Sequence, residues 1–365
     1  MSDPLEPTLM PAGEAPSAPP VHHGILLGRF GLRAGWGILL HLVFCVVLTA
    51  VLTFAALIVT GNLQKQINRA KQPHAAQQST TGTTAAEKQD KPMTVKNTVI
   101  NEGLQFGAVL LATLLMARIE SRRFSVYGLG SIRIRDLLPG AFWGLALLSI
   151  LVGILRALHL LVFDGRLLSG APLAFYAIKW LLACLFIGLL EEYLIRGYLQ
   201  FTLTRGLYGL GERIAPSQPR TAAFWIAALI TSTIFASLHL LNSGENHLGI
   251  LMVFIAGIVF SYALWHTGSL WWGIGFHMAW DWAQSYLYGV PDSGGLSAGR
   301  LFQTHATGNP LLSGGTDGPE GSLLVIPILL LVFVAVRLSP RGTQPSLEPL
   351  DAGSGVPPET AAAIA

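Results

Sequence analysis

Charged residues and cysteines are both scarce in this sequence. Only 12% of its 365 residues are Asp, Glu, Lys or Arg, whereas 52% are hydrophobic. An average soluble domain has about 25% charged residues, so this composition excludes an ordinary soluble fold. The two cysteines, Cys45 and Cys184, both lie in apolar segments. They can therefore build neither a disulfide framework nor a cysteine-rich metal site.

The sequence also shows neither a cleavable signal peptide nor a nucleic-acid-binding pattern. The first 20 residues lack a basic start followed by an apolar run, so we expect no cleavable signal peptide. The net charge of +3 is small, and the basic residues are spread over many loops without interleaved aromatic residues. This pattern argues against a nucleic-acid partner.

Long apolar segments dominate the chain. A helix needs about 20 apolar residues to cross roughly 30 Å of hydrocarbon. Segments of this kind predict an all-α, polytopic transmembrane bundle of about eight spans, at 36–60, 99–117, 138–163, 172–199, 221–241, 248–266, 269–289 and 322–337. Gly140 and Gly144, four residues apart at the start of the third span, predict close helix packing.

The polar stretches divide the chain into parts. We expect disordered tails at both ends, because they are rich in Pro, Ala, Ser and Gly. The predicted division is a tail at 1–34, transmembrane helices at 35–171 with a hydrophilic loop at 61–98, a core at 172–289, a Gly/Pro-rich loop at 290–320, a last transmembrane helix at 321–338 and a tail at 339–365.

Arginines in the short loops predict the orientation, since such loops tend to stay in the cytoplasm when they are basic. With eight spans, four groups fall on one side: Arg29 and Arg33; Arg118, Arg122, Arg123, Arg133 and Arg135; Arg205, Arg213 and Arg220; Arg337 and Arg341. We therefore predict a multi-pass cell-membrane protein with both termini in the cytoplasm.

Ionisable residues inside apolar spans are costly and so are functional candidates by default. The fourth span ends with Glu191, Glu192 and Arg196. Glu192 and Arg196 are four residues apart and share a helix face, so they can form an ion pair. Glu191 lies about 100° round the axis and escapes that pairing. An unpaired carboxylate in a low-dielectric site can act as a general base, although the cluster could also simply mark a helix end at the membrane surface.

The fifth and seventh spans carry the other candidates. His239 alone would be a packed core histidine more often than a catalyst. His277 and Asp281 are four residues apart on one face, where they could equally form a helix-stabilising hydrogen bond. Together, the three groups contain a base, a second imidazole and polar groups that can steady an oxyanion, an inventory suited to hydrolysis by activated water in a polar cavity inside the bundle.

Three motifs in this order resemble the family of CAAX prenyl proteases type II and bacteriocin-processing enzymes, also called the CPBP or ABI family. They are Glu-Glu-x-x-x-Arg at 191–196, Phe-x-x-x-His at 235–239 and His-x-x-x-Asp at 277–281. The resemblance covers about 172–289. It implies an intramembrane endopeptidase that hydrolyses a peptide bond of a membrane-associated protein or peptide.

The resemblance also implies roles for the individual residues. Glu191 and His239 would activate the water, His277 and residue 281 would form the oxyanion hole, and Glu192 with Arg196 would support them. The well-characterised members that cleave prenylated proteins have Asn at the last position, where this chain has Asp281. An ionised Asp cannot donate to an oxyanion, so Asp281 would have to be protonated or would instead orient His277.

Other mechanisms stay open at this point. Glu191, His239, His277 and Asp281 could also bind Zn²⁺, although the sequence lacks a His-Glu-x-x-His helix, and we favour a mechanism without a cofactor. A proton-coupled transporter or a non-catalytic immunity or scaffold protein are the alternatives from other classes. The Gly-x-Ser-x-Gly match at 295–299 lies in a Gly-rich loop rather than between a strand and a helix, so we give it no role.

The simple division into spans places two key residues apart. Glu191 lies toward the cytoplasmic end of its span, and His239 lies toward the opposite end of its own. They must meet if both act on one water. Either a boundary is wrong, or the segment 200–220 dips back into the membrane, or the fourth helix is long and tilted.

Overall fold

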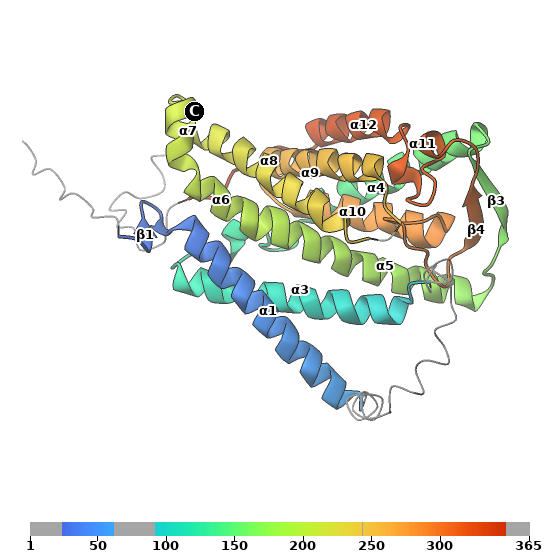
Figure 1. Cartoon of the computed structure of the whole chain (residues 1–365), viewed down its shortest axis with the longest axis horizontal. Coiled ribbons are helices and arrows are strands. Elements are labelled where there is room, and N and C mark those ends of the chain that lie inside the picture. The colour runs from blue at the N-terminus through green and yellow to red at the C-terminus, as the bar shows by residue number, and fades with distance from the viewer. Residues whose placement is uncertain (1–23, 62–91, 243, 348–365) are drawn as a thin grey trace, which may run out of the picture.

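The computed structural model describes residues 24–61, 92–242 and 244–347, and these residues form a bundle of helices (Figure 1). Six helical segments are long and apolar enough to cross a membrane. They are α1 (Ala34–Val59), α3 (Val95–Ile119), α4 (Ile134–Ala157), the continuous segment Ala171–Gly206, α8 (Pro219–His239) and α9 (His247–Thr267). The predicted polytopic helical bundle is confirmed.

The last two predicted spans are helical but shorter than expected. The segment 269–289 contains α10 (Trp271–Trp282), which continues as the π-helix η6 (Ala283–Tyr288). The segment 322–337 contains α12 (Val325–Leu338), whose 14 residues reach only about 21 Å along the axis. Among the described residues there are therefore six helices of spanning length rather than eight, because α10 and α12 have only 12 and 14 residues.

Short elements join these helices. Two two-residue strands, β1 (Leu27–Gly28) and β2 (Gly31–Leu32), pair antiparallel within the segment predicted as an N-terminal tail. Strands β3 (Leu161–Arg166) and β4 (Phe302–Ala306) form a second antiparallel ribbon. The remaining elements are the 3₁₀-helices η4 (Phe124–Tyr127) and η7 (Pro319–Gly321) and the short helices α7 (Tyr208–Ile214) and α11 (Pro310–Ser313). Most of the predicted hydrophilic loop at 61–98 lies outside the described residues.

Helix α10 lies at the centre because glycines let its backbone approach its neighbours. A Cβ atom at Gly140 would collide with the carbonyl of Trp272, and one at Gly144 would collide with that of Phe276. Gly275 of α10 likewise meets the Leu137 carbonyl of α4. The close packing predicted from Gly140 and Gly144 is thus present, and it fixes the helix that carries His277 and Asp281.

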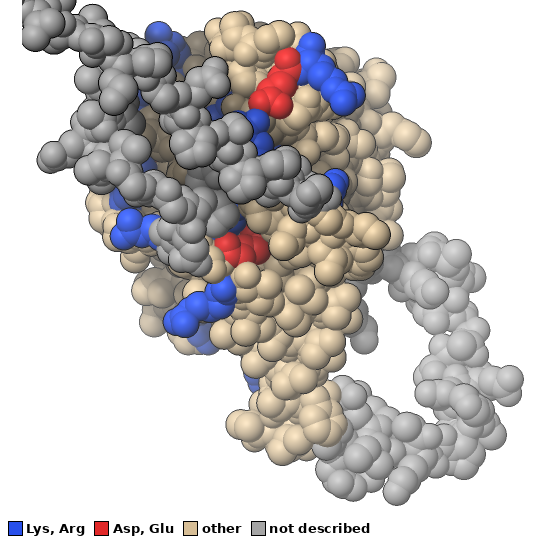
Figure 2. All heavy atoms as spheres, turned by 90° about the vertical axis from the view of Figure 1, so that its left-hand side faces the viewer, with Lys and Arg blue, Asp and Glu red and all other residues tan. Residues whose placement is uncertain are grey.

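Both ends of the described chain meet at one basic end of the bundle. Arg122 donates hydrogen bonds to the carbonyls of Phe30 and Leu347, at 2.5 and 2.7 Å. Gln344 donates to the carbonyl of Trp265 at 2.7 Å, so the beginning of the segment predicted as a disordered C-terminal tail is docked on the bundle. Figure 2 views this end and shows Lys and Arg side chains with few acidic ones. The assignment of this end to the cytoplasm stays a prediction.

Candidate active site

The fourth span is longer than the sequence indicated. Helix α5 (Ala171–Glu192) runs without a break into the π-helix η5 (Tyr193–Leu199) and then α6 (Gln200–Gly206), which gives 36 residues in all. Glu191 therefore lies near the middle of this segment instead of at its end. Of the three ways to bring Glu191 to the depth of His239, the structure shows the long helix. The widened π turn begins directly after Glu192, and such turns are frequent at functional sites.

Helix α8 returns from the basic end and finishes beside η5. The guanidinium carbon of Arg196 lies 4.1 Å from the ring centroid of Phe235, and that ring packs edge-on against His239 at 4.6 Å. Nδ1 of His239 lies 2.9 Å from the Phe235 carbonyl, which can only accept. Nδ1 therefore carries the proton, and Nε2 of a neutral His239 keeps a free lone pair.

The two glutamates have different surroundings. Glu192 forms a buried ion pair with Arg196, in which Nη1 lies 2.9 Å from Oε1 and both side chains are at most 1% exposed. This is the pair that the four-residue spacing predicts. The Glu191 side chain is 30% exposed and faces His277, whose Nε2 lies 3.6 Å from its Oε2. Glu191 is thus the accessible carboxylate of the two.

The imidazole of His277 approaches three carboxyl groups. Its Nε2 lies 3.5 Å from Oδ2 of Asp281 and 3.6 Å from Oε2 of Glu191, and its Nδ1 lies 3.4 Å from Oε1 of Glu192. The His277–Asp281 face predicted on α10 is therefore turned toward the two glutamates of α5. These contacts connect the first and third sequence motifs directly.

A cavity of about 300 Å³ joins all three motifs. Four of the six predicted site residues, Glu191, His239, His277 and Asp281, line it, while Glu192 and Arg196 lie behind its wall. The rest of the wall is mostly apolar and comes largely from α9, α10 and α12, including Val253, Val259, Phe260, Phe276, Val325 and Val332. Such a cavity combines mostly apolar walls with a small set of convergent polar groups.

Sequence reasoning missed three acidic residues that line the same cavity: Glu102, Asp292 and Glu320. Glu102 lies inside an apolar span on α3, so the rule that singled out Glu191 would have found it too. Asp292 and Glu320 come from the Gly/Pro-rich loop, where no periodic pattern indicates which way a side chain points. That loop lines part of the cavity and is held to Met93 by two backbone hydrogen bonds of 2.8 Å, one from the Met93 N–H to the Leu296 carbonyl and one from the Ala298 N–H to the Met93 carbonyl.

Asp292 and Glu320 are held in place by hydrogen bonds. Ser285 donates to Asp292 at 2.6 Å, and the indole of Trp280 donates to Glu320 at 2.9 Å. Burial raises the pKa of Asp292 to about 6, against the lowering effect of the Ser285 hydrogen bond. Burial also raises the pKa of Glu320, and the charges of Asp292 and Asp281 act in the same direction.

Within the described residues, one group of three potential metal ligands has its atoms within 4.8 Å of one another, formed by Asp281, Asp292 and Glu320. Three carboxylates are typical of a hard cation rather than of zinc. Nothing else at this group points to a cation, so we assign no metal to it. The zinc set of Glu191, His239, His277 and Asp281 stays a prediction.

Comparison with known proteins finds one family. Residues 172–283 match the family described as type II CAAX prenyl endopeptidase Rce1-like. The chain matches no curated protein and no solved structure. The matched segment contains all three motifs and runs from α5 to the start of η6, and it supports a membrane protease in general. The family recognised from the motifs is therefore the one whose model matches, and the match covers residues 172–283.

Proposed function

We propose that this protein is an intramembrane endopeptidase whose own side chains activate the hydrolytic water. Its substrate would be a membrane-associated protein or peptide, cleaved in CAAX-type or leader-peptide processing. The observation that carries the proposal is the single cavity lined by Glu191, His239, His277 and Asp281. A buried chamber with accessible bases and mostly apolar walls suits a peptide segment that reaches it from the lipid.

The chemistry would start at Glu191. Its carboxylate takes a proton from the water, whose oxygen attacks the carbonyl carbon of the scissile peptide bond. The free Nε2 of His239 accepts a hydrogen bond from the same water and helps to orient it. When the tetrahedral intermediate collapses, the C–N bond breaks and the leaving nitrogen takes the proton from Glu191. One water is consumed, and a carboxyl group and an amine are formed.

The remaining residues would serve the oxyanion and the framework. His277 and Asp281 are the candidates for donating to the developing oxyanion, since both line the cavity on α10. Glu192 neutralises Arg196 behind the wall and thereby fixes the turn that presents Glu191. The six residues thus divide into three pairs, one for the water, one for the oxyanion and one for the framework.

We favour this mechanism over a zinc hydrolase because the cavity supplies base and donors from its own side chains. A chelator distinguishes the two. Cleavage that survives prolonged EDTA treatment supports the glutamate mechanism, whereas a loss that Zn²⁺ restores supports the zinc set.

The function can be tested before the substrate is known. Protein termini in membranes from cells with the wild-type protein would be compared with those from cells with Glu191→Gln. We expect a set of new termini that depends on Glu191. Glu212→Gln is the matched control, because Glu212 of α7 is 46% exposed, pairs with Arg29 and does not line the cavity. Identical termini in wild type and Glu191→Gln would contradict a peptidase and favour the scaffold or transporter alternatives.

A further inference from the structure

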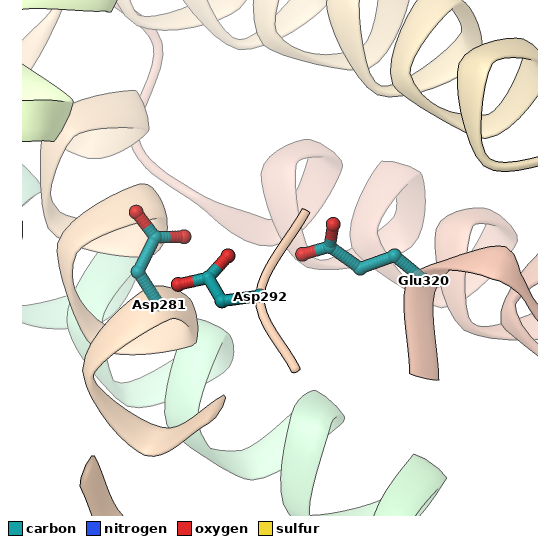
Figure 3. A group of neighbouring side chains, drawn as sticks. All are labelled: Asp281, Asp292 and Glu320. Carbon is teal, nitrogen blue, oxygen red and sulfur yellow. The ribbon is translucent and has the colours of Figure 1, made fainter. Parts of the chain in front are cut away.

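Three carboxyl groups from distant parts of the chain converge at one edge of the cavity (Figure 3). Asp281 comes from α10, Asp292 from the loop after η6, and Glu320 from η7, and their oxygen atoms lie within 4.8 Å of one another. Like charges so close cannot all be ionised without a compensating cation, so such groups share protons.

Asp281 is the member of this group with the least support for a negative charge. Asp292 accepts from Ser285 and Glu320 accepts from Trp280. Among the described residues, none donates a hydrogen bond to Asp281, although its side chain is only 8% exposed. A buried carboxylate without a donor is costly, whereas a protonated carboxyl group can itself donate.

The charged groups around Asp281 also affect whether its carboxyl group is protonated. His277 of α10 is the group that opposes protonation, because an imidazolium 3.5 Å away would stabilise an ionised Asp281. His277 is shared, however, with Glu191 and Glu192 of α5. The titratable or charged groups facing this region are Glu102 from α3, Cys184, Glu191, Glu192 and Arg196 from α5 and η5, His239 from α8, His277 from α10, Asp292 and Asp317 from the loop and Glu320 from η7.

The balance of these groups is acidic. Six carboxyl groups, those of Glu102, Glu191, Glu192, Asp281, Asp292 and Glu320, line the cavity or lie behind its wall, and they face at most three cations, which are Arg196 and the two imidazoles of the cavity. At least three carboxyl groups therefore lack a counter-charge, and protons are the simplest compensation in a buried site.

We propose that Asp292, with Glu320 beside it, is a positioning residue that holds a proton on Asp281. Asp281 then presents an O–H donor to the cavity next to His277. On the proposed function, on which this consequence rests, Asp281 would donate to the oxyanion as an amide side chain would. The loop between η6 and α12 thereby controls the protonation of a residue on α10.

The proton can be measured without a substrate. Infrared titration of the full-length protein in lipid vesicles detects the C=O stretch of a protonated carboxylic acid, and subtraction of Asp281→Asn in the same background assigns it to Asp281. At pH 7 we expect this band in the wild type. In Asp292→Asn, the pH at which the band is half lost should fall by about one unit or more.

Controls separate this effect from a merely structural one. Glu320→Gln provides a second, independent variant and should shift the titration in the same direction by a smaller amount. Asp164→Asn, in the exposed β3–β4 ribbon, should leave it unchanged. Absence of the Asp281 band at pH 7, an unmoved titration in both variants, or a band that appears only after EDTA treatment would overturn the proposal.

The two proposals can fail separately. If new termini depend on Glu191 but the Asp281 band is absent, the peptidase stands and the protonated Asp281 does not. If the band is present and moves in Asp292→Asn but no termini depend on Glu191, the proton assignment stands without the peptidase.

Discussion

Residues 172–283 and the loop between η6 and α12 both supply side chains to one cavity, but they do so by different means. The first region places Glu191, His239 and His277 on long helices whose backbones are fixed by close packing. The second places Asp292 and Glu320 by hydrogen bonds from Ser285 and Trp280, which themselves belong to the helices. The helices therefore position the reacting groups by backbone packing, whereas the loop carboxylates take their positions from hydrogen bonds to helical residues.

The largest difference between the two regions should appear in catalysis. His239→Gln removes the free imidazole nitrogen of the cavity, and we expect the cleavage rate of a substrate identified by its termini to fall about 10²–10⁴-fold. His305→Gln replaces an exposed histidine of β4 and should leave the rate unchanged. Equal rates for both variants would remove His239 from the mechanism.

The buried ion pair behind the cavity should dominate stability. Removing one partner of such a pair leaves an uncompensated charge and costs about 3–5 kcal/mol, which we expect for Arg196→Ala in denaturant unfolding in detergent. Arg29→Ala breaks the exposed pair with Glu212 and should cost at most about 1 kcal/mol. A double variant, Glu192→Gln with Arg196→Met, should recover part of the loss. Similar costs for the buried and exposed pairs would contradict the framework role.

The contact between α4 and α10 gives a smaller effect. A side chain at Gly144 would meet the Phe276 carbonyl, so Gly144→Val should lower the free energy of unfolding by about 1–3 kcal/mol through overpacking. Gly153→Val is the matched control on the same helix, since nothing lies within 4 Å of its added Cβ. Equal stability of the two variants would show that close packing at Gly144 does not hold α10 in place.

The smallest effect belongs to the outer ribbon. Nδ1 of His305 on β4 and Oδ2 of Asp164 on β3 lie 2.9 Å apart in an exposed hydrogen bond. Asp164→Asn should therefore change the free energy of unfolding by less than about 1 kcal/mol and leave cleavage unaffected. A large loss of cleavage in this variant would mean that the ribbon takes part in the function.

What the sequence could predict follows from periodicity. The apolar segments predicted the bundle, and four-residue spacing predicted that Glu192 pairs with Arg196 and that His277 shares a face with Asp281. Residue spacing does not show whether a helix ends at a given residue or continues into another helical segment. The continuation through η5 therefore stayed hidden, and with it the way in which Glu191 and His239 reach one cavity.

Periodicity could not predict the positions of residues that lie outside helices and strands. Asp292 and Glu320 reach the cavity through tertiary contacts of a Gly-rich loop, which leaves no pattern in the sequence. Glu102 was a different case, because an acidic residue in an apolar span is a visible signal. The packing of the chain near Phe30 and Leu347 also left no pattern in the sequence, because it depends on tertiary hydrogen bonds from Arg122 to the backbone carbonyls of these two residues.

The most direct test of the central claim is an experimentally determined structure of the full-length protein in lipid. The account predicts that the Glu191 carboxylate and Nε2 of His239 both lie within hydrogen-bonding reach of one water in the cavity. Side chains of Glu191 and His239 more than about 8 Å apart, with no route to closure, would contradict a shared water.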